Sequence, residues 1–209
     1  MAMRRIQFGR WMAVAAAALA LAGVGGVAHA AQADPAAAQI EDFDTQLVDV
    51  MKQAKSLSVQ ARLHKLEPVV ARTYDTPTMI RFAVGPSWSS IPPAQQQALA
   101  EAFAKLTAAS YAHQISGYSG EHFEISPNVV TRGPDKVVAT TLISPHDAPV
   151  SISYRMRQSG GTWKIIDVYY NGAISQVTTR RADFQSTLQQ GGAAALIAHL
   201  NALVDKQLK

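Results

Sequence analysis

Apolar residues recur at helical spacing in the first part of the chain beyond residue 40. Phe43, Leu47 and Val50 fall on one face of a helix, and a second apolar stripe follows over residues 59–70. Pro68 lies within this second stripe, and it predicts a bend or an end there because proline has no N–H and clashes with the preceding turn. The pattern predicts two amphipathic helices.

Two more helices are predicted before the middle of the chain. Residues 76–84 have a proline near their start, where a helix tolerates it, and Gly85 with Pro86 ends the segment. Ser90, with Pro92 and Pro93, then opens a long helix that extends to about Ser116. Its apolar stripe includes Leu99, Phe103 and Leu106. The first half of the chain is therefore expected to be helical.

The middle of the chain changes to a period of two. Residues 151–157 alternate strictly, with Ile152, Tyr154 and Met156 on one face and polar groups on the other. The short glycine-containing turns between segments favour an antiparallel sheet, because parallel strands need long crossovers. Four strands are predicted, over residues 121–131, 136–145, 149–158 and 162–171.

Helical spacing returns near the C-terminus. Val177, Phe184 and Leu188 share one face, Gly191 and Gly192 interrupt it, and a last helix follows over residues 196–204. Helices, four antiparallel strands and helices predict an α+β fold, in which a curved four-stranded sheet lies against several helices.

The N-terminus has the pattern of a secretory signal. Three arginines precede an apolar run over residues 11–27, and Ala28-His29-Ala30 offers small residues for cleavage after Ala30. We expect residues 1–30 to be a cleaved signal peptide, residues 31–39 a flexible linker and residues 40–209 a single domain. The mature protein would then be soluble and periplasmic.

Composition excludes several classes of function. Without the three arginines of the leader, the 19 basic residues fall to 16, against 15 acidic ones. A nearly neutral chain is not typical of a nucleic-acid-binding protein. The chain has no cysteine, which excludes disulfides, thiol catalysis and cysteine-bound metals.

The candidate chemical groups are few. His113, His122 and His146 each have a carboxylate nearby in the sequence, but no metal-binding spacing is present, so surface or turn positions are favoured and no metal or cofactor is expected. Asp167 lies among apolar residues of the last strand. It is read either as a carboxylate that caps nearby backbone or pairs with an arginine, or as a buried acid–base group with a raised pKa.

A family resemblance rests mainly on residues 163–203. This segment has Trp-Lys-Ile-x-Asp-Val at its start, the Gly191-Gly192 pair and Leu-Ile-x-x-Leu from Leu196. Upstream, residues 69–112 have a tryptophan before a glutamine-rich helix. Over residues 40–205 the chain resembles the MlaC family, which is also called the toluene-tolerance family. Residues 174–179 and 193–195 are similar to the subgroup associated with hopanoid biosynthesis.

The resemblance implies a periplasmic lipid carrier with a cystatin- or NTF2-like fold around an apolar cavity. Its ligand would be a phospholipid or a hopanoid. Its partners would be an inner-membrane ABC lipid transporter complex and an outer-membrane lipoprotein complex. The residues expected to line the cavity are Phe82, Val84, Trp88, Leu99, Phe103, Leu106, Tyr111, Ile152, Tyr154, Met156, Trp163, Ile165 and Phe184.

Two other functions stay open at this point. A curved sheet backed by helices also suits a small acid–base enzyme, with Asp167 and a histidine as the catalytic pair. A periplasmic interaction module would instead have a filled core and an exposed apolar patch. Arg180 and Arg181 are candidates for docking or for a lipid phosphate, although a solvated helix face is the favoured interpretation.

Overall fold

The computed structural model describes residues 34–172 and 174–209. The predicted signal peptide, residues 1–30, lies outside the described residues. Short 3₁₀ helices follow α1 and α3, at Ala54–Ser56 and Gly85–Ser90. The α-helices are α1 (Pro35–Gln53), α2 (Val59–Thr73), α3 (Thr76–Val84), α4 (Pro93–Gln114) and α5 (Gln176–Gln207).

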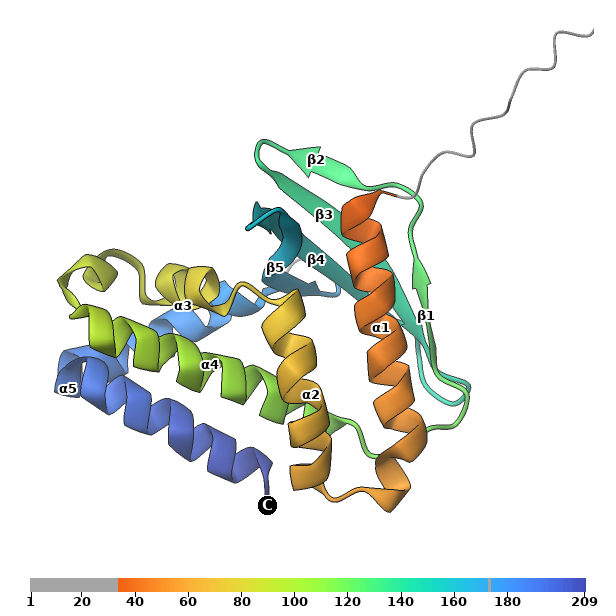
Figure 1. The fold of residues 1–209 in the computed structure, drawn as a ribbon, viewed down its shortest axis with the longest axis horizontal. Helices are drawn as coiled ribbons and strands as arrows, with labels where there is room; N and C mark the ends of the chain where they lie inside the picture. The colour runs from red at the N-terminus through yellow and green to blue at the C-terminus, as the bar shows by residue number, and fades with distance from the viewer. Residues whose placement is uncertain (1–33, 173) are drawn as a thin grey trace, which may run out of the picture. The chain divides into compact units, whose positions relative to one another are not determined.

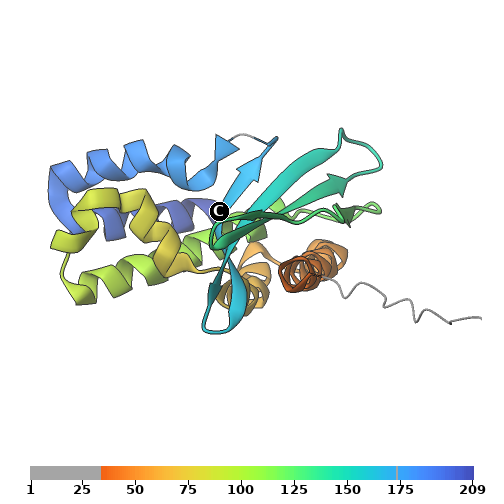
Figure 2. The ribbon, with the colours of Figure 1, turned by 90° about the horizontal axis from the view of Figure 1, so that it is seen from above.

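The strands form one antiparallel sheet in the order β1-β3-β4-β5-β6, and β2 also pairs with β3. Helices α1 and α2 lie across one face of this sheet, while α3, α4 and α5 stand together at one end (Figures 1 and 2). The α+β class is confirmed. The strands are β1 (His122–Ile125), β2 (Val130–Arg132), β3 (Asp135–Ile143), β4 (Val150–Ser159), β5 (Thr162–Tyr170) and β6 (Ile174–Ser175).

The predicted number of four strands is wrong, because the described residues contain six. The expected first strand, residues 121–131, is divided into β1 and β2, which pair with different parts of β3. Pro127 lies between them, and proline cannot donate a hydrogen bond to a strand ladder. Strand β6 has only two residues, which is too short for alternation to be recognised in a sequence.

Helix α1 begins earlier than expected. Residues 35–39 were assigned to a flexible linker, but they form the first turn of α1, and Ala36 is fully buried. Asp34 accepts a hydrogen bond from the N–H of Ala36, and Pro35 occupies the first helical position, so the N-terminus is capped. Of the expected linker, residues 31–33 lie outside the described residues.

Proline and glycine have opposite effects in two of the helices. Helix α2 continues through Pro68 to Thr73, so Pro68 does not end it, and its neighbours Leu66 and Val69 are buried. Helix α5, in contrast, is interrupted at Gly191 and Gly192, as predicted. Gly192 has a φ of 66°, a left-handed conformation that a side chain would disfavour.

An aromatic cluster joins the helices to the sheet. The ring of Phe43 in α1 lies edge-on to Tyr74, Tyr111 and Tyr154, with centroid separations of 5.6, 5.6 and 6.1 Å. Such edge-to-face pairs each stabilise by about 0.5–1.5 kcal/mol beyond the burial of their area. The three tyrosines come from the end of α2, from α4 and from β4, so Phe43 contacts all these elements at once.

Within residues 34–172 and 174–209, no helix has both the length and the apolar composition that crossing a bilayer requires. Helix α5 is long, but it contains many polar residues and the glycine break.

Phe43→Ala tests the importance of the aromatic cluster. Phe43 is fully buried, so the substitution leaves a cavity among three rings, and we expect the free energy of unfolding to fall by about 3–5 kcal/mol. Chemical denaturation followed by circular dichroism measures it. Lys65→Ala, on the exposed side of α2, is the control and should change stability by no more than about 0.5 kcal/mol. Equal stability of both variants would contradict the central role of Phe43.

Candidate ligand-binding pockets

Pocket A lies between the helix-facing side of the sheet and helices α1 and α4. Its volume is about 440 Å³, within the range of about 300–1,000 Å³ that is typical of small-molecule sites. Its polar residues include Glu121, Ser144 and Asp147. Its apolar and aromatic lining consists of Leu47, Met51, Tyr111, Ile115, Phe123, Leu142, Ala148, Val150, Ile152, Tyr154 and Tyr170.

Pocket B adjoins pocket A on the other side of Tyr111. Its volume is about 300 Å³, and it lies among α4, α5, the end of α2 and strand β5. The resemblance implied one enclosed apolar cavity, whereas the space beside α4 is divided into pockets A and B, which share Tyr111, Gln114 and Tyr170 as lining residues.

The tyrosines place polar atoms inside an otherwise apolar interior. The hydroxyl oxygens of Tyr74 and Tyr111 lie 2.6 Å apart, in hydrogen-bond contact. Burial raises the pKa of Tyr74, Tyr111 and Tyr154 well above the ordinary value, so these hydroxyls stay protonated at neutral pH. The tyrosine side chains therefore add no charge to the walls of the two pockets.

Four of the predicted lining residues line these pockets. Ile152 and Tyr154 line pocket A, Phe103 lines pocket B, and Tyr111 lines both. The strict alternation along β4 predicted that Ile152 and Tyr154 share one face, and this is the face toward pocket A. The apolar stripe of α4 likewise included Phe103, which lies toward pocket B.

The other nine predicted residues line neither pocket. Phe82, Trp88 and Trp163 are partly buried: Phe82 lies beneath the guanidinium of Arg157, and Trp163 beneath the ammonium of Lys136. The remaining six are core residues with at most 1% of their surface exposed: Val84, Leu99, Leu106, Met156, Ile165 and Phe184.

Sequence reasoning missed much of the lining of pocket A. Phe123, Leu142 and Val150 face the helices from β1, β3 and β4, and alternation along these strands could have identified them. Leu47 belongs to the predicted stripe of α1. Their contribution depends on how the helices lie over the sheet, which periodicity does not determine.

Arg180 departs from the favoured interpretation of a solvated helix face. It is partly buried and lines pocket B, with its guanidinium 5.9 Å from the ring centroid of Phe103. Burial lowers the pKa of Arg180, although a guanidinium remains charged at neutral pH. Arg181 is exposed, and it donates a hydrogen bond to the carbonyl of Phe82 at 3.0 Å.

Asp167 is buried, and its carboxylate is occupied by capping bonds. It accepts hydrogen bonds from the hydroxyl of Ser175 and from the N–H groups of Val168 and Val177. It therefore holds β6 and the start of α5 against β5. This arrangement agrees with the interpretation of Asp167 as a backbone cap.

The three histidines are exposed. His113 contacts the carbonyl of Gln207, and His122 lies 3.7 Å from a carboxylate oxygen of Glu124. In the part of the chain that the structure describes, no three histidine, aspartate or glutamate side chains come close enough together to hold a metal ion.

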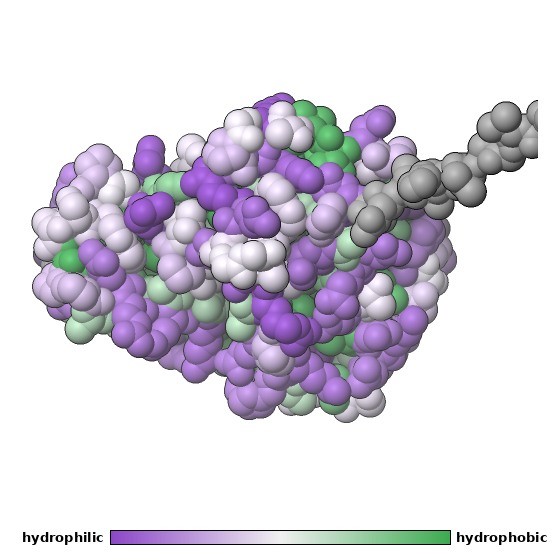
Figure 3. Space-filling model, turned by 45° about the horizontal axis from the view of Figure 1, so that its top comes forward, coloured by the Kyte–Doolittle hydropathy of each residue, from purple (hydrophilic) through white to green (hydrophobic). Residues whose placement is uncertain are grey.

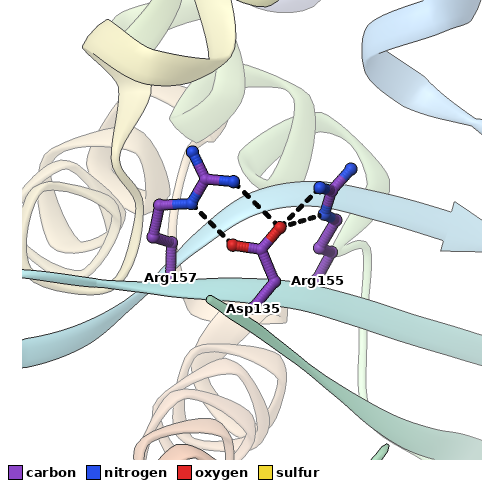
Figure 4. Close-up of polar contacts among 3 residues, drawn as sticks. All are labelled: Asp135, Arg155 and Arg157. Carbon is purple, nitrogen blue, oxygen red and sulfur yellow. Dashed lines mark hydrogen bonds and ion pairs between the residues drawn. The ribbon is translucent and has the colours of Figure 1, made fainter. Parts of the chain in front are cut away.

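Asp135 is a buried carboxylate on the face of the sheet opposite to pocket A, and both of its oxygens have hydrogen-bond donors. It is 1% exposed and accepts hydrogen bonds from Arg155 and Arg157, at 2.7 Å from Arg155 Nε and 2.6 Å from Arg157 Nε (Figure 4). Burial by itself would raise the pKa of Asp135, but the two guanidinium groups outweigh it and hold the pKa below the ordinary value.

Asp44 differs from both of these aspartates. It is 4% exposed, and neither carboxylate oxygen has a hydrogen-bond partner among the described residues. Burial raises the pKa of Asp44 from 3.8 to about 8. The side chain is therefore largely neutral at pH 7.

The sequence matches the family model described as the MlaC protein over residues 41–202. The chain belongs to the MlaC family. The match includes most of α1, the whole sheet and most of α5, so it reaches every element that lines pockets A and B.

A solved structure of the same fold comes from Ralstonia solanacearum. It is described as a phospholipid-binding protein in complex with a phospholipid. The two structures superpose with a TM-score of 0.73 at 21% sequence identity, covering 84% of this MlaC-family chain and all of the other. The comparison supports the α+β fold.

Asp44→Asn tests the raised pKa of Asp44. Between about pH 4 and pH 8 the folded protein keeps a proton on Asp44 that the unfolded chain releases. The free energy of unfolding should therefore fall as pH rises through this range, by at most about 1.4 kcal/mol per pH unit, and level off above about pH 8. Asp44→Asn removes this loss, so its stability relative to the wild type should increase with pH.

Urea denaturation at pH 4, 6 and 8 measures the difference. Asp42→Asn, an exposed position on the same helix, is the matched control, and its difference from the wild type should change little. A constant difference between Asp44→Asn and the wild type would show that Asp44 titrates normally.

Proposed function

We propose that this MlaC-family protein is a periplasmic lipid carrier that holds acyl tails in pockets A and B. The observation that carries the proposal is the apolar wall of pocket A, which lies between sheet and helices and adjoins pocket B at Tyr111. Each methylene removed from water contributes about 0.8 kcal/mol, so a whole acyl chain left in water costs on the order of 10 kcal/mol. A carrier must therefore enclose its tails.

A phospholipid is the ligand that we favour over a hopanoid. The Ralstonia solanacearum protein of the same fold is described in complex with a phospholipid. The partial burial of Arg180 in pocket B adds a second argument, because a guanidinium binds a phosphate through paired N–H donors. A phosphate is common to all phospholipids, so head-group selectivity should be weak.

Membership of the MlaC family and the signal-like pattern of residues 1–30 support a route of transport across the periplasm. The carrier would move lipid between an outer-membrane lipoprotein complex and an inner-membrane ABC transporter. Transfer of a whole lipid requires no bond to form or break. Apolar walls and a phosphate contact are sufficient for such a role.

The two rival functions find less support. Asp167 lines neither pocket, and its carboxylate is already engaged by three donors, so it is poorly placed as an acid–base group. On the face shown in Figure 3, hydrophilic side chains predominate and hydrophobic ones form only small groups. A docking module would need a broad apolar patch, and this face does not show one.

Native mass spectrometry of the protein purified from a bacterial periplasm tests the carrier function. We expect an added mass equal to one phospholipid, and lipid extraction should identify its class. An added mass that corresponds to a hopanoid would support the carrier function and show that the ligand is a hopanoid instead of a phospholipid. A mass equal to the bare protein, unchanged after incubation with phospholipid vesicles, would contradict the proposal.

Val150→Glu tests the assignment of pocket A. Val150 faces the pocket from β4, and a carboxylate there would lie against the acyl tail, at a cost of several kcal/mol. We expect loss of the co-purified lipid. Ser151→Glu, the adjacent exposed residue on the opposite face of the same strand, is the control and should keep the lipid. If both variants fold and retain lipid, pocket A is not part of the lipid-binding site.

Arg180→Gln tests the phosphate contact. Loss of a charge-assisted hydrogen bond should weaken phospholipid binding about tenfold, because such bonds contribute about 1.5–3 kcal/mol. Binding of a fluorescent phospholipid and of the matching uncharged diacylglycerol would be measured. Only the first should weaken, and Arg181→Gln should bind both as the wild type does. Equal weakening for both lipids would assign Arg180 a structural role.

A further inference from the structure

A third hollow lies along α1, next to strand β1. Figure 1 shows α1 and β1 side by side at the edge of the sheet. The hollow between them has a volume of about 500 Å³, and we call it the α1–β1 groove. Phe123 is its one residue in common with pocket A. The groove is lined by Ala37, Ala38, Glu41, Asp44, Thr45, Val48, Asp49, Lys52, His122, Phe123 and Ile125.

Asp44 is the unusual residue of this groove. More than nine tenths of its surface is buried, yet neither carboxylate oxygen has a hydrogen-bond partner among the described residues. Buried polar groups are nearly always paired, because an unpaired one loses its hydration without compensation. Asp135 and Asp167 follow this rule within the same protein. A buried carboxyl without a partner, at the wall of a groove, is therefore suited to a donor from outside the chain that displaces the side chains covering its oxygens.

The charges around the groove favour a cationic donor. Glu41 and Asp49 line it beside Asp44, and Lys52 is the lysine among its lining residues. Lys52 lies 3.7 Å from Asp49, and both side chains are more than half exposed. The groove therefore has more carboxyl groups than cations, and a positive charge placed in it is attracted by Glu41 and, once Asp44 releases its proton, by Asp44 as well.

Apart from Thr45 and His122, the rest of the lining is apolar. Ala37, Ala38 and Val48 line the groove from α1, and Phe123 and Ile125 line it from β1. Small and aliphatic side chains next to a buried carboxyl suit a compact ammonium on a hydrocarbon stem.

We propose that the α1–β1 groove binds a primary ammonium group on an apolar stem, with the carboxylate of Asp44 as its counter-ion. The site lies outside the two pockets of the proposed carrier function and does not depend on that function. The ammonium could come from a free alkylamine or from the head group of an aminophospholipid. The experiment below separates these two sources.

Binding should be linked to release of a proton. In the absence of a cation, burial keeps Asp44 largely protonated at pH 7. An ammonium beside it favours the carboxylate, so affinity should increase from pH 6 to pH 8 and change little above. The ionisable groups near Asp44 are Glu41, Asp49 and Lys52 on α1, His122 on β1, and Tyr74, Tyr111 and Tyr154 of the aromatic cluster.

Isothermal titration calorimetry of the mature chain with octylammonium chloride and with octanol tests the site. The two probes have the same stem and differ in the charged group. We expect octylammonium to bind at least about tenfold more tightly than octanol at pH 8, which corresponds to about 1.4 kcal/mol. Asp44→Asn should abolish this preference, and Asp42→Asn, which lies outside the groove, should retain it.

The carboxyl carbon of Asp44 gives a second readout on the unmodified protein. Its ¹³C resonance should shift to the carboxylate position at pH 7 when octylammonium is added, and octanol should leave it unchanged. Equal affinity for the two probes, or an Asp44 resonance that does not respond to octylammonium, would overturn the proposal. Either result would show that the groove binds apolar stems alone or that Asp44 is not the counter-ion.

Vesicles then identify the source of the ammonium. Stronger flotation of the wild type than of Asp44→Asn with phosphatidylethanolamine vesicles, but not with phosphatidylcholine vesicles, would assign the site to an aminophospholipid head group. Equal flotation of wild type and variant, together with binding of octylammonium, would assign it to a free amine.

Discussion

The packing of Phe43 against three tyrosine rings is the interaction on which the rest of this structure depends. One side chain of α1 contacts the end of α2, helix α4 and the central strand β4, so these elements share one point of contact. The same rings form walls of the two pockets, since Tyr154 lines pocket A, Tyr74 lines pocket B and Tyr111 lines both. The cluster therefore joins the layers while its tyrosines also define the space between them. Aromatic rings suit both roles because they bury a large area and adopt few conformations.

Three buried aspartates illustrate how differently one residue type is used in this fold. Asp135 is compensated by two guanidinium groups, and Asp167 by a hydroxyl and two N–H groups. Both contribute to local structure, the first across strands β3 and β4 and the second at the junction of β5, β6 and α5. Asp44 lacks such partners, and burial shifts its pKa to about 8. An uncompensated group of this kind reduces stability, and the proposed role of Asp44 in ligand binding would account for its presence.

The pockets arise where the packing of helices on the sheet is incomplete. Leu106, Met156 and Phe184 fill the interior fully, whereas the residues around Tyr111 leave about 440 Å³ on one side and about 300 Å³ on the other. Arg180 places a charged group beside the apolar walls of pocket B, which would suit the phospholipid proposed as the ligand.

Local patterns were sufficient for the α+β class, for helices α3 and α4, for the break at Gly191 and Gly192, and for the face of β4 that Ile152 and Tyr154 occupy. These features depend on periodicity and on the backbone preferences of proline and glycine, which act over a few residues. Other features depend on contacts between distant segments. The division of the first strand into β1 and β2 follows from pairing with β3, and the burial of Asp44 follows from the placement of α1 over the sheet. Ile165 and Leu106 satisfy the same apolar pattern as Ile152 and Phe103, yet the first two fill the core and the other two line pockets. A hydrophobic pattern specifies which residues avoid water, but the packing of helices against the sheet decides where space remains among them.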